Sequence, residues 1–148
     1  MPDTFDRRCQ LGASRRRLED AEALHSCKRW GGSIYLGGYA IECSLKSLIC
    51  YLEIKNNFKD TRTFKKRLQG SELHSLVKLL SELPVVQRAI TLDRTNGYQD
   101  AWNTVSFLWR NDELRYSERT GDEQESKRFI QAVQLLHQFI LAQQGEAS

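Results

Sequence analysis

The sequence predicts an all-α fold, a single-domain antiparallel bundle of about five helices. Apolar residues recur at intervals of three and four along most of the chain, which is the spacing of one helix face. There are only 2 prolines in 148 residues, as a largely helical chain requires. No stretch of alternating apolar and polar residues predicts a strand. The connections between helical stretches are short, which favours antiparallel neighbours.

The length and composition indicate one soluble domain. We expect the bundle to span residues 14–143, with flexible segments at residues 1–13 and 144–148. No apolar run reaches the roughly 18–20 residues of a membrane span, and the N-terminus lacks the apolar region of a signal peptide. The 4 cysteines form no CxxC pair and are interpreted as reduced thiols. We therefore expect a cytoplasmic protein without membrane association.

The first two helices are expected at residues 14–28 and 33–53. Ser14 is a candidate N-cap for the first helix, because its hydroxyl can accept from a free backbone N–H. The segment Trp30-Gly31-Gly32 predicts a break or tight bend before the second, central helix.

A third helix is expected between a cap at Ser71 and a stop at Pro84. Residues 85–95 are ambiguous. Asn96 is a candidate cap for a fourth helix, which runs to about residue 109. The expected inner face of the third helix consists of Leu73, Leu76, Val77, Leu80 and Leu83. The expected inner face of the fourth consists of Tyr98, Ala101, Trp102, Val105, Leu108 and Trp109.

A fifth helix closes the bundle. Thr120 and Glu123 have the spacing of a capping box, and the helical pattern continues to about residue 143. Its expected inner face consists of Phe129, Ile130, Val133, Leu136, Phe139 and Ile140.

The central helix is apolar or small on nearly every side, apart from one stripe. Tyr35, Tyr39, Glu42 and Lys46 follow one another at spacings of four, three and four, and so lie along one line. Buried charges must be paired or lie at a cleft. The stripe is therefore the expected place for a polar partner or ligand. Glycines weaken a helix, so Gly37-Gly38 require a packing reason, and close helix–helix contact is the expected one.

The charge is uneven along the chain. Residues 1–70 carry a net charge of +6 and residues 71–148 a net charge of −3. Phe58 and Phe64 are interleaved with a basic run that suits a phosphate backbone and unstacked bases. The alternative is a solvated, mobile loop whose two phenylalanines dock on the core. The expected nucleic-acid-binding residues are Lys55, Lys59, Arg62, Lys65, Lys66 and Arg67.

A second charged segment, Trp109 to Ser117, follows the fourth helix. Arg115 beside Tyr116 is expected to turn inward at least in part, and Glu42 is then its expected acidic partner. The alternative is that Arg115 and Tyr116 only attach this loop to the bundle. None of the 3 histidines has a partner at metal-ligand spacing, so no metal site is expected, and His74 is interpreted as a packing or capping residue. No motif predicts a cofactor.

The order of these features resembles the HEPN domain family (higher eukaryotes and prokaryotes nucleotide-binding). The segments that carry the resemblance are Tyr35-Leu36-Gly37-Gly38-Tyr39-Ala40-Ile41-Glu42-Cys43-Ser44-Leu45-Lys46-Ser47-Leu48, Leu73-His74-Ser75-Leu76 and Leu114-Arg115-Tyr116. The resemblance implies an antiparallel helical bundle that forms a homodimer. Many members are RNases or RNA-binding toxins of toxin–antitoxin or defence systems, and some pair with a small nucleotidyltransferase.

The resemblance also implies a site. Nuclease members share an arginine followed four to six residues later by a histidine, and the motifs of two subunits form the cleft. Here Arg110-Asn111 fits the start, but positions 115–117 are Arg115, Tyr116 and Ser117, so the histidine is absent. Histidine exchanges protons near neutral pH and arginine does not. The candidate catalytic residues are Arg110, Arg115 and Tyr116, and the candidate substrate-binding residues are Asn111, Glu42, Lys46 and Tyr39.

Two functions remain open at this point. The first is binding of RNA or nucleotide phosphate by an HEPN-like protein, with or without weak metal-independent RNase activity. The second is a non-catalytic interaction or dimerisation module that docks a nucleotidyltransferase or another protein partner.

Overall fold

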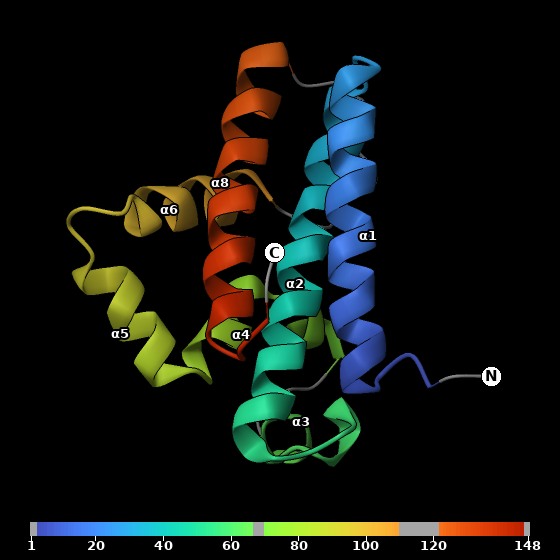
Figure 1. The fold of residues 1–148 in the computed structure, drawn as a ribbon, viewed down its shortest axis with the longest axis vertical. Coiled ribbons are helices and arrows are strands. Elements are labelled where there is room, and N and C mark those ends of the chain that lie inside the picture. The colour runs from blue at the N-terminus through green and yellow to red at the C-terminus, as the bar shows by residue number, and fades with distance from the viewer. Residues whose placement is uncertain (1–2, 67–69, 110–121, 147–148) are drawn as a thin grey trace.

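A computed structural model describes residues 3–66, 70–109 and 122–146 and shows an all-α bundle. The described residues form seven α-helices and two short 3₁₀ helices, η1 and η2, and contain no strand. Three long helices, α1 (Arg7–Ser26), α2 (Trp30–Glu53) and α8 (Glu123–Ala142), stand side by side, with α2 packed against both others (Figure 1). The predicted fold class is confirmed.

Helix α1 begins earlier than predicted. The carboxylate of Asp6 accepts from the backbone N–H groups of Arg8 and Cys9, so Asp6 is the N-cap and the helix starts at Arg7. The prediction of Ser14 as the cap is wrong. Ser14 is fully buried inside the helix, where its hydroxyl donates to the Leu11 carbonyl.

Helix α2 also begins earlier than predicted. Trp30, Gly31 and Gly32 do not form a break but the first turn of the helix. The actual turn lies just before it, where Lys28 has a φ of 61°. Ile54 ends the helix in a left-handed conformation, also with a positive φ.

The two interior glycines of α2 have the packing reason that the sequence required. A Cβ on Gly37 would come within 2.9 Å of the Phe129 ring of α8, and a Cβ on Gly38 would overlap the indole of Trp109. The Trp109 indole N–H donates to the Tyr35 carbonyl at 3.0 Å and so fixes the ring over α2. Glycine is therefore the residue that admits these two aromatic side chains.

The predicted third helix is divided into shorter pieces. After η1 (Phe58–Asp60) and α3 (Arg62–Lys66), the chain forms η2 (Gly70–His74) and then α4 (Leu76–Ser81). The α4 cap is the Ser75 hydroxyl, which accepts from the Lys78 N–H, and not Ser71. Of the expected inner face, Leu76, Leu80 and Leu83 are buried, whereas Val77 is exposed.

Pro84 starts a helix instead of simply ending one. It occupies the first position of α5 (Pro84–Leu92), where its missing N–H has no cost. Asn96 does not cap α6 (Tyr98–Leu108): Gly97 takes the N-cap position with a positive φ, and the Asp93 carboxylate accepts from the Tyr98 N–H. Helices α5 and α6 lie beyond α8 from α1 (Figure 1).

Helix α8 supplies much of the core. Asp122 caps it by accepting from the Glu125 N–H, and Thr120 of the predicted capping box lies outside the described residues. Five of its predicted inner residues are buried, namely Phe129, Ile130, Val133, Leu136 and Ile140. Gln144 beyond it is buried and donates to Ser47, so the folded unit extends from at least Arg7 to Gln144.

Candidate polyanion-binding surface and the polar stripe of α2

The stripe on α2 changes character along its length. Tyr35 and Tyr39 are half-buried at one end, and Glu42 and Lys46 are buried at the other. Tyr35 and Tyr39 pack edge to face at a centroid distance of 5.0 Å, and Tyr39 packs in the same way against Trp109 at 5.6 Å. The aromatic end is thus a packed cluster, and the charged end requires its own partners.

Glu42 and Lys46 are partners for each other. The Lys46 Nζ lies 3.1 Å from the Glu42 carboxylate, and the two side chains are only 6% and 4% exposed. The Lys46 ammonium also lies 5.6 Å from the centroid of the Phe58 ring, within cation–π range. Because the pair sits one helical turn apart on a rigid helix, its geometry is fixed and neither charge is left alone.

His74 is the second partner of Glu42, and the sequence interpretation missed it. Its Nδ1 lies 3.3 Å from both carboxylate oxygens of Glu42. An ionised carboxylate only accepts, so Nδ1 carries the hydrogen and donates it. The His74 side chain is 47% exposed, in contrast to the carboxylate it contacts. The sequence signal for this contact is the buried acid Glu42 itself, which requires a partner.

Some predicted site residues lie outside the described part of the chain. These residues are Arg67, Arg110, Asn111, Arg115 and Tyr116. The pairing of Glu42 with Arg115 therefore stays a prediction. Of the remaining candidates, the structure brings together Tyr39, Glu42 and Lys46 on one helix line, as the spacing indicates.

The basic run after α2 is folded around its aromatic residues. Phe58 in η1 is fully buried and packs edge to face against the half-buried Phe64 of α3. Phe5 packs on Phe64 from the N-terminal segment. The prediction that these phenylalanines stack on unpaired bases is therefore wrong for Phe58, and the alternative, docking on the core, is confirmed for both rings.

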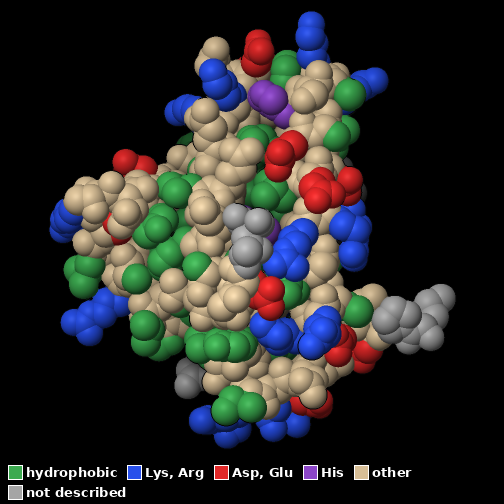
Figure 2. All heavy atoms as spheres, in the orientation of Figure 1, with side chains coloured by type: hydrophobic (Ala, Val, Ile, Leu, Met, Phe, Trp, Pro, Cys, Tyr) green, Lys and Arg blue, Asp and Glu red, His purple; other side chains and the backbone are tan. Residues whose placement is uncertain are grey.

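The cations of this run point outward. Five of them are exposed, and none forms an ion pair with a residue that the structure describes: Lys55, Lys59, Arg62, Lys65 and Lys66. Lys59 lies 4.4 Å from the centroid of the Phe5 ring. Blue side chains lie at the lower end of the molecule in Figure 2, where Figure 1 places α3, as well as at other places on this face. We call η1, α3 and these five cations the basic surface.

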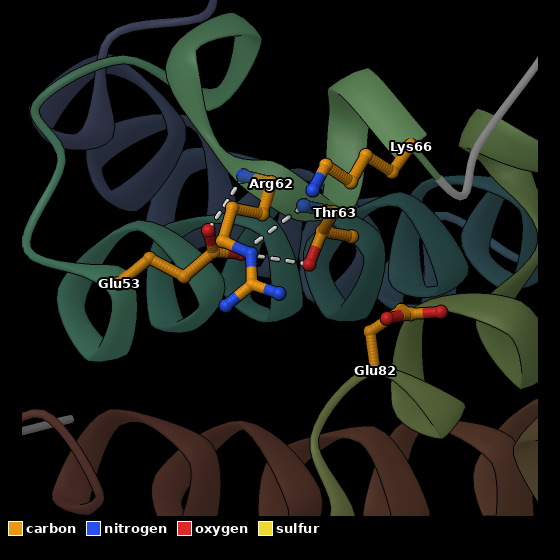
Figure 3. A pocket seen from close by; sticks show the side chains of 5 residues that line it. All are labelled: Glu53, Arg62, Thr63, Lys66 and Glu82. Atoms are coloured by element: carbon orange, nitrogen blue, oxygen red, sulfur yellow. Dashed lines mark hydrogen bonds between the residues drawn. The ribbon is translucent and has the colours of Figure 1, made fainter.

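A pocket of about 210 Å³ opens beside the basic surface and is lined by Glu53, Arg62, Thr63, Lys66 and Glu82 (Figure 3). The Glu53 carboxylate accepts from the backbone N–H groups of Arg62 and Thr63 at 2.6 and 3.3 Å, and from the Thr63 hydroxyl at 2.7 Å. Glu53 thus caps α3 and fixes the backbone at its start against α2. Glu82 lies on the opposite side of the pocket from Arg62 and Lys66 (Figure 3).

An apolar groove of about 200 Å³ adjoins this pocket and shares Glu53 and Glu82 with it. Its walls are apolar side chains from the end of α2 and the start of α5, of which Leu52 and Val85 are exposed. Hydrophobic side chains are visible close to the basic surface on the face drawn in Figure 2. The groove is lined by Ile49, Leu52, Leu83, Pro84, Val85 and Val86, together with Glu53 and Glu82.

The cysteines are free thiols, as the sequence predicts. Burial raises the pKa of the Cys43 thiol to about 11, and burial likewise raises the pKa of Cys50 to about 11. Both stay protonated near neutral pH and are weak nucleophiles. Among the described residues, no group of three potential ligands could hold a metal ion. No helix in this part of the chain has the length and apolar character needed to cross a membrane.

Comparison with known proteins adds no assignment: no family model, no curated protein and no solved structure matches the chain.

Proposed function

We propose that the protein binds the phosphate backbone of single-stranded RNA through the basic surface. The observation that carries this proposal is five exposed cations that form no ion pair within 4.0 Å among the described residues, next to a single acidic residue of the same run, Asp60. Exposed cations without a close ion pair are available to phosphates, and each phosphate contact releases counterions from the nucleic acid. The choice of RNA over other polyanions rests on the resemblance to the HEPN family.

Binding through this surface is independent of base sequence. Phe58 is buried and Phe64 is half-buried, so neither ring is free to stack fully on a base. The contacts left to the surface are ionic contacts to phosphate, which carry no sequence information. RNAs of equal length and different sequence should therefore bind with similar affinity.

Fluorescence anisotropy with a labelled single-stranded RNA tests the proposal. For about five phosphate contacts, the logarithm of the association constant should fall with the logarithm of salt concentration with a slope of about −3.5. Failure of the RNA to bind at low ionic strength would remove the proposal.

The apolar groove favours a second candidate function, homodimerisation. Its occupant would be a second copy of this chain, because the groove adjoins a pocket that carries both signs of charge, the acids Glu53 and Glu82 and the cations Arg62 and Lys66. A two-fold axis beside this pocket can place the acids of one copy opposite the cations of the other. Exposed Val85, at 77%, would then become buried.

Sedimentation of the Val85→Asp variant tests this second candidate. Val85 is exposed, so the change should leave the monomer folded and abolish dimers. Val77→Asp on α4 is the matched control, because Val77 is also exposed, at 57%, and lies outside the groove. A wild-type chain that sediments as a monomer at all concentrations would contradict the candidate.

A further inference from the structure

A hydrogen bond to Glu42 fixes one ring nitrogen of His74, and the half-exposed ring leaves the other nitrogen accessible. The Nδ1–H of His74 donates to the Glu42 carboxylate, so in the neutral ring Nε2 carries the free lone pair. The ring is about half-exposed, whereas the carboxylate is buried beneath it. This is the geometry of an imidazole that is oriented by an acid and can accept a proton at its outer nitrogen.

Neither simpler role accounts for His74. It does not cap α4, because the Ser75 hydroxyl does so. It is not a packed core residue, because it is 47% exposed. Glu42 does not need it for charge balance either, since Lys46 already forms a buried ion pair with that carboxylate. The contact between His74 and Glu42 therefore orients the histidine more than it satisfies the acid.

Buried side chains connect the oriented histidine to the basic surface. Glu42 contacts Lys46, and Lys46 lies over the ring of Phe58. Phe58 belongs to η1 and is followed directly by the exposed Lys59. A chain of direct contacts thus leads from His74 to the segment that carries the proposed phosphate-binding cations.

We propose that His74 is a catalytic residue for cleavage of RNA, with Glu42 as its positioning residue. The proposal rests on the RNA binding proposed above. His74 would supply the proton-exchanging histidine that positions 115–117 lack. His74 lies on η2, in the part of the chain that the structure describes.

The reaction is a transesterification within the RNA. Nε2 of His74 takes the proton of a 2′-hydroxyl, and the 2′-oxygen forms a bond to the adjacent phosphorus. The bond from phosphorus to the 5′-oxygen breaks, and that oxygen takes a proton from water. The resulting hydroxide accepts the proton from the imidazolium, which restores neutral His74. The products are a 2′,3′-cyclic phosphate end and a 5′-hydroxyl end.

Cleavage of a labelled RNA in the presence of EDTA tests the role of His74. The His74→Gln variant keeps an amide donor for Glu42 but has no side-chain group that exchanges protons near neutral pH. We expect its rate to fall by about 100-fold or more, which is the scale of general acid–base catalysis. The wild type should yield cyclic phosphate ends.

Two controls separate this proposal from the proposed function. His25→Gln, purified in the same way, should cleave like the wild type, since His25 bonds to Ser126 far along the chain from Glu42. Binding of a 2′-deoxy analogue, which cannot be cleaved, should be unchanged in His74→Gln within about two-fold, because the five cations of the basic surface are all retained. Wild type that binds the analogue but leaves RNA intact would overturn the role of His74 and leave the binding function standing. Wild type that binds neither would overturn both. Equal cleavage by wild type and His74→Gln, or cleavage abolished by EDTA, would also contradict the proposal.

The Glu42→Gln variant tests positioning. It removes the charge but retains an oxygen that can accept from Nδ1, so the ring loses part of its orientation. We expect kcat to fall by about tenfold with KM changed less than about two-fold, since only the reacting group is disturbed. Circular dichroism should confirm that the variant is folded. An unchanged kcat in folded Glu42→Gln would contradict the positioning role.

Discussion

The Trp109 side chain occupies the space over Gly38 of α2. The indole lies where a Cβ of residue 38 would be, and its N–H is bonded to the Tyr35 carbonyl, so the ring cannot simply rotate away. Gly38→Ala should therefore destabilise the protein by about 1–3 kcal/mol or more, the cost of overpacking. Chemical denaturation measures this loss.

Gly12→Ala is the matched control within a helix. Its new methyl group would meet only the end of the Arg16 side chain, at 3.2 Å, which can move. Here the better helix propensity of alanine should dominate and stabilise α1 by up to about 1 kcal/mol. Equal destabilisation by both substitutions would show that Trp109 does not occupy the space over Gly38.

Buried His137 predicts acid sensitivity. It lies 2% exposed, and its Nε2 is 3.0 Å from the Ser14 hydroxyl. Burial, aided by the nearby Arg15 charge, lowers the pKa of His137 from 6.5 to about 4. Below pH 6.5 the unfolded chain binds a proton that the folded chain does not. Stability should therefore fall as the pH drops from about 6.5 to 4, by roughly 3 kcal/mol for this group.

A pH series of urea denaturation checks that loss. His137→Gln removes the titrating group and should flatten the curve in this window, whatever its own effect on the absolute stability. A wild-type curve that is as flat as that of His137→Gln would mean that the ring is protonated in the folded state.

At the scale of elements, α3 depends on a cap that comes from another helix. Glu53 at the end of α2 accepts from two backbone N–H groups at the start of α3. Glu53→Ala should leave both donors without this acceptor and cost about 1 kcal/mol, as for an N-cap. Faster amide hydrogen exchange within Arg62–Lys66 reports the loss.

Glu82→Ala provides the comparison for Glu53→Ala. Glu82 lines the same pocket from the end of α4 but caps nothing in α3. Its removal should leave exchange in α3 unchanged. If amide exchange in α3 were accelerated equally in the two variants, its cause would be the loss of negative charge in the pocket and not the loss of the cap.

The long elements were predictable from sequence because their apolar period is sustained. Helix α8 shows this best, with Phe129, Val133, Leu136 and Ile140 all buried. The first residue of each helix was less predictable, because several nearby residues have side chains that could serve as the N-cap. Asp6 and Ser75 cap their helices, while the equally suitable Ser14 is buried and Ser71 is not the cap.

The candidate site was predictable only in part, for a similar reason. Spacing alone places Glu42 and Lys46 on one face, and burial then demands partners. The partner His74 is 32 residues from Glu42 in the chain, so no local spacing indicates the contact. The same limit applies to Phe58, whose burial depends on how η1 folds back onto α2.

At the scale of the whole molecule, the charges and the apolar surface converge on one end. The basic surface, the Glu53–Glu82 pocket and the apolar groove share residues or adjoin one another. Binding of RNA and self-association would therefore influence each other, because Arg62 and Lys66 would serve in both. We expect RNA to weaken any dimer formed through the groove, which sedimentation with and without RNA would measure.

The central claim, phosphate binding by the basic surface, is tested most directly by the salt dependence of RNA affinity in two charge-matched variants. Lys65→Gln/Lys66→Gln removes two cations of this surface, and Arg88→Gln/Arg94→Gln removes two exposed cations in and just after α5. The first variant should reduce the magnitude of the salt slope by about 1.4, and the second should leave it unchanged. Equal reductions in both variants, or an unchanged slope in the first, would contradict the account.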